Sequence, residues 1–253
     1  MSHKPERQLS ILHLYFDLMN LYGDWANVEV LALALSARGF RVNIGKKSVG
    51  DEIDFGAYDF VYIGSGTEQS LIACISDIMN YKDSLTKCIE NGTHILATGN
   101  AHELFGRTVT ESTGIKHEAV GLLDFETIQG RGRIAGDCVC KPSFMQEKLV
   151  GFINRASEGQ VGDVERPFIL ELGPGANDKL DKEGIMYKNL LGTYITGPVL
   201  VRNPPLLRYF ADKLMGNSSD AESHLGTDAF FAHQELAYKM ALSELCARIG
   251  KTN

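Results

Sequence analysis

The chain has 253 residues, of which 44% are hydrophobic and 23% are charged, and its formal net charge at pH 7 is −7. A chain of this size can bury a large core without disulfides or metal ions, and an acidic balance without a basic stripe argues against nucleic acid or an anionic membrane surface as the main partner. The odd number of five cysteines is typical of a reducing compartment rather than of a disulfide framework. Residues 1–8 are polar and charged, and no apolar run approaches the roughly 20 residues of a membrane span, so we expect a cytoplasmic protein with no signal peptide and no membrane helix.

The first 106 residues alternate four times between strand-like and helix-like segments. Strands are expected at residues 9–15, 40–45, 58–63 and 94–98. After the first strand, Asp24 is placed to cap a helix in which Val28, Leu31 and Leu35 recur at helical spacing. Residues 68–90 form a second helical region, which we expect to be broken near Asn80. Such alternation predicts a parallel sheet with right-handed crossovers.

Beyond Gly106 the pattern favours strands with short connections, which are typical of antiparallel pairing. We expect these strands at residues 121–127, 133–140, 148–154 and 168–172. A helix is predicted over residues 204–215, with proline near its start, and a last helix begins after Thr227 or Asp228. The face that this last helix would bury contains Leu236, Ala237, Met240, Ala241 and Leu245.

The predicted fold is an open, mostly parallel α/β sheet with flanking helices, of the Rossmann- or flavodoxin-like type. Extra antiparallel strands lie in its second half, and a helix ends the chain. We expect residues 1–216 to form one domain, and residues 217–253 to form a linker and a C-terminal helix packed on it.

The segment from Thr93 to Gly106 is predicted to form a buried strand, a tight turn at Gly99 and Asn100, and a helix that starts near Ala101. Nucleophile elbows are built in this way, and open α/β sheets bind ligands at the carboxyl ends of their strands. The glycine at the tip of the turn has no side chain that could attack a substrate. The segment is therefore either an ordinary turn or an active-site scaffold whose nucleophile is missing.

Other candidate residues each have a structural alternative. The loop Gly64-Ser65-Gly66 between a strand and a helix could bind an anion or an oxyanion through its N–H groups, or it could be a tight turn. Arg133 could hold a carboxylate or could be a solvated surface arginine. His102 could face the site as a base, but a position on the helix surface is the better interpretation. Cys138 and Cys140 share one face of a strand, and because a metal would need two further ligands we interpret them as packed residues.

Several segments in their order along the chain resemble the class I glutamine amidotransferase domains of the cobyric acid synthase-like (CobB/CobQ-like) group. Within that group the chain is similar to the glutaminase subunits, called GatD, of bacterial lipid II isoglutaminyl synthases, which amidate a peptidoglycan precursor. The resemblance runs from about Leu9 to Met215. Its most specific segments are residues 20–24, 121–125, 151–152 and 183–194, the last of which leads to Gly197 and Pro198.

The resemblance implies a chemistry and a partner. In this family a cysteine at the elbow attacks the side-chain amide of glutamine, a histidine serves as base, and ammonia passes to a synthetase subunit related to Mur ligases (MurT-like). No cofactor and no metal are implied. Substrate binding is implied for Gly64, Ser65, Gly66 and Asn100, and Arg133 falls where the family places an arginine that holds substrate.

The sequence departs from the family at both catalytic positions. Gly99 stands at the nucleophile position and Thr196 at the histidine position, and Glu103 stands where the family usually has glutamine. Glycine offers no nucleophile, and a threonine hydroxyl cannot act as a general base near neutral pH. We therefore expect an elbow of intact geometry, no intact catalytic residue and glutaminase activity near background.

These observations leave three hypotheses for the function. The first is a pseudo-glutaminase that binds a Mur-ligase-like partner, or glutamine or a related small amide, without hydrolysing glutamine. The second is an active glutaminase subunit that supplies ammonia to a MurT-like synthetase with a non-standard or partner-supplied nucleophile. The third is an unrelated small-molecule enzyme or sensor that uses Asp17, Asp24, His102 or Glu103 in acid–base chemistry.

Overall fold

A computed structural model describes residues 7–177, 181–216 and 229–249 of the chain. Its central sheet has six strands in the order β11-β12-β4-β3-β1-β2. All neighbouring strands run parallel except β11, which is antiparallel to β12. The strands are β1 (Gln8–Leu14), β2 (Arg41–Lys47), β3 (Phe60–Ile63), β4 (His94–Thr98), β11 (Ile185–Tyr187) and β12 (Leu190–Thr193). The predicted open, mostly parallel sheet is confirmed.

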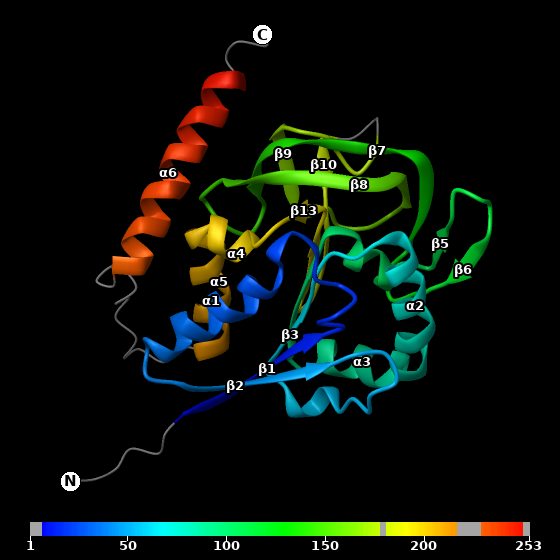
Figure 1. Ribbon diagram of the computed structural model, residues 1–253, viewed down its shortest axis with the longest axis horizontal. Coiled ribbons are helices and arrows are strands. Elements are labelled where there is room, and N and C mark those ends of the chain that lie inside the picture. Colours follow the sequence, from blue (N-terminus) through cyan, green and yellow to red (C-terminus); the bar gives the residue numbers. More distant parts are fainter. Residues whose placement is uncertain (1–6, 178–180, 217–228, 250–253) are drawn as a thin grey trace.

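Helices cover both faces of this sheet (Figure 1). The α-helices are α1 (Trp25–Ser36), α2 (Glu68–Ile78), α3 (Lys82–Glu90), α4 (Val199–Arg202), α5 (Pro204–Met215) and α6 (Ala229–Ile249). Short 3₁₀ helices are η1 (Leu21–Gly23), η2 (Phe55–Ala57), η3 (Met79–Tyr81) and η4 (Gly99–Phe105). The predicted break near Asn80 is confirmed, because η3 separates α2 from α3.

The core has two main layers, one on each face of the central sheet. Successive side chains of a strand point to opposite faces, so in β1 Ile11 packs with α1 and α5 whereas Leu12 packs with α2 and α3. In β3, Tyr62 and Val61 divide in the same way. The central strands are thus buried on both sides, which explains why their sequences are nearly continuous apolar runs.

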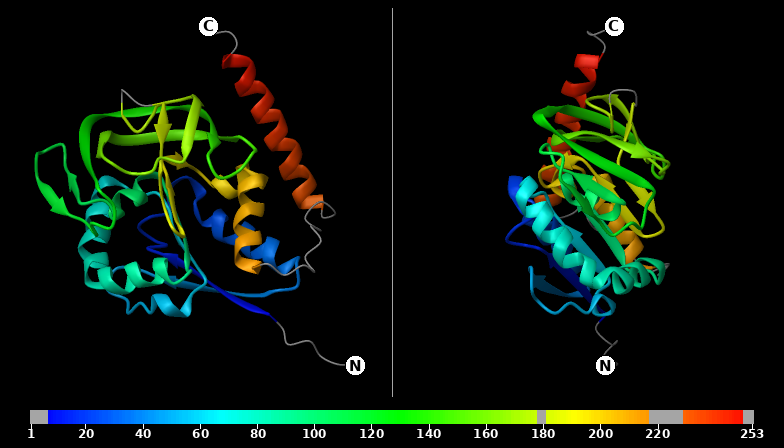
Figure 2. Two further views of the ribbon diagram at one scale, coloured as in Figure 1. Left: turned by 180° about the vertical axis from the view of Figure 1, so that it is seen from behind. Right: turned by 90° about the vertical axis from the view of Figure 1, so that its right-hand side faces the viewer.

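A second sheet lies across the carboxyl ends of the central strands (Figures 1 and 2). Its strands are β5 (Thr108–Thr110), β6 (Lys116–Glu118), β7 (Phe125–Pro142), β8 (Leu149–Gly162), β9 (Phe168–Leu172), β10 (Lys182–Glu183) and β13 (Ile195–Thr196). The order is β10-β9-β7-β5-β6, and β8 pairs with β7 and β13. The pairs are antiparallel apart from β5 with β7.

The long β7–β8 ribbon differs from the prediction. Residues 125–127 and 133–140, expected in separate strands, belong to the single strand β7, and β8 continues well past residue 154. Between the pairs Gln129–Ser157 and Ile134–Arg155, four residues of β7 face one residue of β8. The sequence Gly130-Arg131-Gly132-Arg133 therefore forms a bulge within the ribbon rather than a connection between two strands.

Helix α6 lies on the opposite side of the body from α2 and α3 (Figure 2). Tyr238 and Leu245 pack on Val139 of β7 and Val150 of β8, and the Tyr238 hydroxyl donates a hydrogen bond to the Lys148 carbonyl at 2.7 Å.

The predicted buried face of α6 is wrong in part. Leu236 is 57% exposed and Met240 is 64% exposed, because the ribbon side chains, rather than the apolar spacing within the helix, decide which side of α6 docks. Thr227 and Asp228, the predicted caps, lie outside the described residues.

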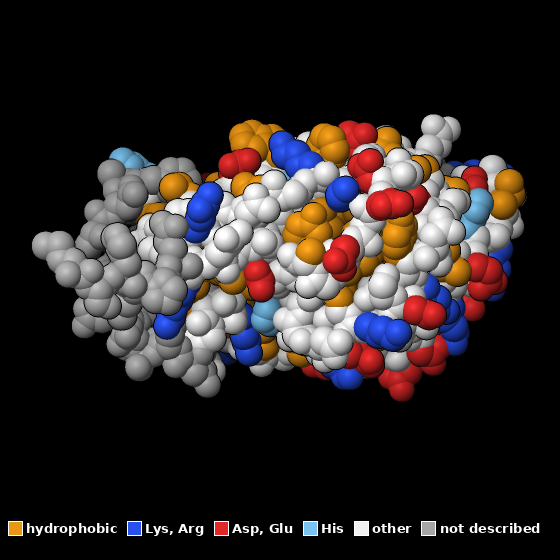
Figure 3. All heavy atoms as spheres, turned by 90° about the horizontal axis from the view of Figure 1, so that it is seen from below, with side chains coloured by type: hydrophobic (Ala, Val, Ile, Leu, Met, Phe, Trp, Pro, Cys, Tyr) orange, Lys and Arg blue, Asp and Glu red, His pale blue; other side chains and the backbone are white. Residues whose placement is uncertain are grey.

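Surface charge is mixed on the face seen in Figure 3. Acidic and basic side chains are interspersed there, and no continuous basic band crosses the described part of that face. Among the described residues, no helix combines the length and apolar character that a membrane crossing requires.

Two Leu→Ala substitutions in α6 test which side of the helix docks. Leu245→Ala should lower the free energy of unfolding by about 2–3 kcal/mol because it leaves a cavity against the ribbon. Leu236→Ala, a matched change in an exposed side chain, should alter it by less than about 0.5 kcal/mol. Urea unfolding followed by circular dichroism at 222 nm measures both. Equal losses, or a larger loss for Leu236→Ala, would show that the helix docks through the face predicted from the sequence.

Candidate functional site

The site is built where β3 and β4 end side by side in the central sheet. β4 ends at Thr98, and the chain turns at Gly99 into the 3₁₀ helix η4, in place of the α-helix expected from Ala101. Gly99 is buried and has a φ of +60°, a conformation in which a side chain is strained. Next to it, β3 leads into Gly64, Ser65 and Gly66, all three of which are buried.

Ser65 fills the space in which a side chain at position 99 would lie. A Cβ atom built on Gly99 would come within 2.1 Å of the Ser65 Oγ atom and 2.7 Å of the Ser65 Cβ atom. Both distances are shorter than any real contact, so no cysteine fits there unless Ser65 moves. Rotating the hydroxyl away would not suffice, because the Cβ atom of Ser65 is itself too close.

Two N–H groups of the glycine loop, those of Ser65 and Gly66, already have acceptors within the chain. The Ser65 N–H donates to Oδ2 of Asp24 at 2.6 Å, and the Gly66 N–H donates to Oδ1 of Asn100 at 2.9 Å. Asn100 also donates from Nδ2 to the Gly66 carbonyl at 3.0 Å. An oxyanion at this loop would have to displace both side chains.

Asp24 does not cap α1 as predicted. Its backbone is already helical and its side chain makes no capping hydrogen bond; the carboxylate turns inward to Ser65 instead. Burial raises the pKa of Asp24 to about 7, against hydrogen bonds from Ser65 that lower it. Beside it, the Tyr62 hydroxyl accepts from Asn27 Nδ2 and lies 2.7 Å from Thr98 Oγ1, so a polar network underlies the turn.

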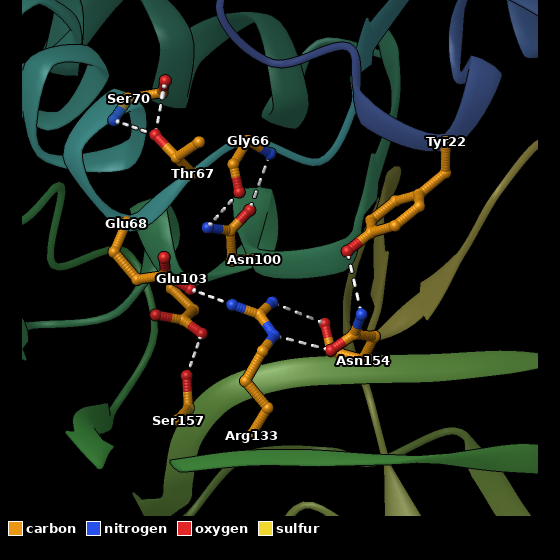
Figure 4. Close-up of polar contacts among 10 residues, drawn as sticks. All are labelled: Tyr22, Gly66, Thr67, Glu68, Ser70, Asn100, Glu103, Arg133, Asn154 and Ser157. Atoms are coloured by element: carbon orange, nitrogen blue, oxygen red, sulfur yellow. Dashed lines mark hydrogen bonds and ion pairs between the residues drawn. The ribbon is translucent and has the colours of Figure 1, made fainter. Parts of the chain in front are cut away.

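Arg133 reaches from the β7 bulge to the mouth of the site (Figure 4). Its Nη1 atom lies 2.9 Å from Oε1 of Glu68 at the start of α2, and its Nε donates to Oδ1 of Asn154 at 2.7 Å. Asn154 in turn donates to the Tyr22 hydroxyl at 3.0 Å. This chain of contacts crosses the mouth, and the cavity left inside is about 10 Å³, which is room for at most one water molecule.

Thr196 lies at the edge of the second sheet and is 3% exposed. Its hydroxyl donates to the Phe152 carbonyl at 2.9 Å. Neither Thr196 nor Gly99 is among the residues that line the small cavity at the turn.

His102 is fully buried rather than on a helix surface. Because a 3₁₀ helix has three residues per turn, His102 lies over Gly99, and its Nδ1–H donates to the Gly99 carbonyl at 2.7 Å. Its ring packs edge-on against Tyr194 with ring centres 4.2 Å apart. Burial lowers the pKa of His102 to about 3, so the imidazole is neutral and serves to hold the turn.

Glu103 is buried beneath the turn. Its Oε1 atom accepts from the hydroxyls of Ser157 and Tyr194, whereas Oε2 has no hydrogen-bond partner among the described residues. Burial raises the pKa of Glu103 to about 7, against these two hydrogen bonds and nearby Arg155. A second carboxyl, Glu183, is buried in the same region with its pKa also raised to about 7 by burial. It begins the segment 183–194 on which the resemblance rests, but no acid–base role was predicted for it.

No thiol is placed to replace the missing nucleophile. Four of the five cysteines are buried and none of the five lines the cavity at the turn. Burial raises the thiol pKa of Cys74, Cys88, Cys138 and Cys140, which disfavours the thiolate. Cys138 and Cys140 are packed in the core, and no metal-binding cluster occurs among the described residues.

The four residues of the acid–base hypothesis do not share a cavity either. Asp17 accepts from Ser48 near the protein surface, and none of Asp17, Asp24, His102 and Glu103 lines the space at the turn. Sequence reasoning missed the side chains that close this space, namely Ser65 as a filler, Glu68 and Asn154. Tyr22 lies within residues 20–24, a segment that the sequence did single out.

Comparison with known proteins defines the class to which this fold and site belong. The model of the CobB/CobQ-like glutamine amidotransferase domain matches residues 10–204. The chain therefore belongs to the CobB/CobQ-like glutamine amidotransferase family.

Within that class, similar proteins are GatD subunits of the glutamine-hydrolysing lipid II isoglutaminyl synthase. The chain is 31% identical over 211 residues to the subunit of Staphylococcus aureus (strain N315), covering 81% of this chain and 84% of that protein. It is 34% identical over 203 residues to the subunit of Streptococcus pneumoniae (strain ATCC BAA-255 / R6), covering 79% and 77%.

Solved structures of glutamine amidotransferases also align with the chain. One crystal structure has a TM-score of 0.49 and 14% identity, covering 81% of this chain and 99% of that chain. Another, from Thermotoga maritima, has a TM-score of 0.46 and 13% identity, covering 98% and 99%.

A double-mutant cycle tests the contact between Ser65 and position 99. Gly99→Ala should lower the free energy of unfolding by about 2–4 kcal/mol, since overpacking and the positive φ both oppose the new methyl group. In a Ser65→Gly background the same change should cost only about 1 kcal/mol, the cost of the backbone conformation alone. Equal losses in the two backgrounds, measured by chemical unfolding, would mean that Ser65 does not occupy this space.

Glu103→Gln tests the buried carboxyl through its pH dependence. The folded-state pKa of about 7 lies above the ordinary value of 4.5 for a glutamate side chain, so the stability contributed by this group is complete below the unfolded-state pKa and is lost as the pH rises to about 7. At pH 8 the variant should therefore be more stable than the wild type by about 1–3 kcal/mol, and at pH 5 the difference should largely vanish. Asp24 and Glu183 titrate in both proteins, so their contributions to the pH dependence of stability cancel in the difference between the variant and the wild type. A difference that grows toward low pH would contradict the assignment.

Proposed function

We propose that this chain is a GatD-like subunit that keeps the glutamine amidotransferase fold but does not hydrolyse glutamine. The observation that carries the proposal is the turn after β4, where Gly99 offers no nucleophile and Ser65 fills the space that a cysteine would need. Hydrolysis of a carboxamide by this family requires a thiolate at that place and a base beside it. Gly99 carries no thiol, and the imidazole that lies over it, that of His102, is buried and donates to the Gly99 carbonyl.

Two further features support the proposal. The N–H groups of Ser65 and Gly66 donate to Asp24 and Asn100, so neither of these two groups is free to stabilise charge on an oxyanion. The Thr196 hydroxyl is held by a backbone carbonyl. When all members of such a catalytic unit are lost, only the small rate supplied by binding and orientation remains.

The partner that we propose is a synthetase subunit related to Mur ligases, acting in amidation of a peptidoglycan precursor. The similar proteins from Staphylococcus aureus and Streptococcus pneumoniae are, by name, subunits of lipid II isoglutaminyl synthase. A subunit that has lost hydrolysis while keeping its fold would stabilise or regulate such a partner, which would then use free ammonia.

Ammonia release from L-glutamine tests the loss of activity. The chain alone and the chain with a Mur-ligase-like subunit should both release ammonia at the background rate, while the Staphylococcus aureus GatD subunit serves as positive control. A glutamine-mimicking electrophile should label neither protein of the pair. Release more than tenfold above background would overturn the proposal, and mass spectrometry of a labelled residue would then identify a non-standard or partner-supplied nucleophile.

Co-purification tests the partner. A tagged chain should retain a Mur-ligase-like subunit from the same genome through size-exclusion chromatography, and the complex should synthesise its amide from ammonium but not from glutamine. If the chain did not retain the subunit, the proposed role as a partner of the synthetase would be wrong. The loss of hydrolysis would still be tested separately by the ammonia-release assay.

A further inference from the structure

The glycine loop binds a primary carboxamide of its own chain. The Asn100 side chain receives a hydrogen bond from the Gly66 N–H at 2.9 Å and donates one to the Gly66 carbonyl at 3.0 Å. A carboxamide oxygen and nitrogen are thus both paired with a single backbone residue, beside the turn at Gly99. These are the two groups that the side-chain amide of a free glutamine would also present.

The mouth of the site binds a carboxylate of its own chain. Glu68 Oε1 lies 2.9 Å from Nη1 of Arg133, and Asn154 fixes the same guanidinium through its Oδ1 atom and its backbone carbonyl. An arginine oriented in this way is well suited to a carboxylate. In Figure 4 the Arg133 guanidinium lies between Glu68 on one side and Asn154 on the other, and Asn100 lies above it next to Gly66.

We propose that the pocket at the turn is self-occupied: Asn100 holds the carboxamide position and Glu68 the carboxylate position that a small ligand carrying both groups, such as L-glutamine, would take. The inference rests on the proposed function, because a pocket that no longer turns over substrate is free to retain its own side chains. It goes further in naming the two groups that exclude the ligand.

The two internal occupants are held with different strength. The side chains of Arg133 and Glu68 are 46% and 36% exposed, and ion pairs in contact with water are weak. Asn100 is half-buried and makes two hydrogen bonds to a buried residue. Removing Glu68 alone should therefore free only the mouth, whereas removing both side chains should open the whole pocket.

Binding of L-glutamine, measured by isothermal titration calorimetry, tests the proposal. The wild type should show no binding, and the Glu68→Ala/Asn100→Gly variant should bind at least tenfold more tightly, with preference for the L over the D enantiomer. Adding Arg133→Ala to that variant should abolish binding. The matched control is Glu90→Ala/Asn189→Ala, which removes an exposed ion pair with Lys188 and a side-chain hydrogen bond to a backbone carbonyl far from the site, and it should behave as the wild type.

The possible outcomes separate this inference from the proposed function. Tight glutamine binding by the wild type, or no binding by a folded double variant, overturns self-occupancy while leaving the loss of hydrolysis intact. Ammonia release by the wild type overturns the proposed function instead. Circular dichroism establishes whether each variant is folded.

A single variant keeps the test valid if the double variant does not fold. Glu68→Ala loses only a half-exposed ion pair, and L-alanine carries the carboxylate without the amide. Titration with L-alanine should shift the Arg133 Nε–H resonance in nitrogen-15 NMR spectra of this variant and leave it unchanged in the wild type. Equal shifts in both proteins, or none in the variant, would contradict the assignment of Glu68.

Discussion

The space beside Gly99 has room for one side chain, and the side chain of Ser65 occupies it. β3 and β4 are neighbours in the parallel sheet, so the residues that follow them are brought together at the same edge. A side chain at position 99 and the side chain at position 65 would thus compete for one volume. Ser65, Gly99 and the side chains that accept from the loop N–H groups fit one another. Placing a side chain at position 99 would therefore require changes at the other positions as well.

The interior beneath the turn is unusually rich in carboxyl groups. Asp24, Glu103 and Glu183 are all buried, and burial raises each pKa to about 7. Perturbed groups of this kind usually indicate catalysis, yet here their hydrogen bonds go to backbone amides and hydroxyls of the scaffold. We interpret them as a structural network that supports the loop, the turn and the start of β13 from below.

The sequence allowed the sheet to be predicted well and the site only in outline. The short apolar runs of β3 and β4 bounded by glycine and polar residues indicated strands near their observed positions, and the missing side chain at Gly99 followed from the turn pattern. Predictions based on local spacing failed where a tertiary contact decided the outcome. Asp24 turned inward to a loop amide, and the face of α6 was set by the ribbon beneath it. Which side chain fills a gap between two strand ends depends on distances that no sequence pattern encodes.

The type of helix after Gly99 is another feature that residue spacing alone could not predict. A 3₁₀ rather than an α-helical turn moves His102 from the surface to the interior, and with it the interpretation of that histidine changes from a candidate base to a neutral group that holds the turn. The difference between the two helix types is a fraction of a residue per turn, which is below what residue spacing can resolve over seven positions.

Strand β7 both pairs with β8 and carries Arg133 at the mouth of the site, and the bulge at residues 130–133 assigns these two roles to different residues. The pairing of residues 134–140 with residues 149–155 fixes the ribbon, whereas the four bulged residues have no partners in register on β8. Insertions, deletions or charge changes in this bulge would alter how far the Arg133 side chain extends over the site without shifting the strands on either side. The bulge is therefore an adaptable segment at the rim, through which a new selectivity could evolve while the core stays as it is.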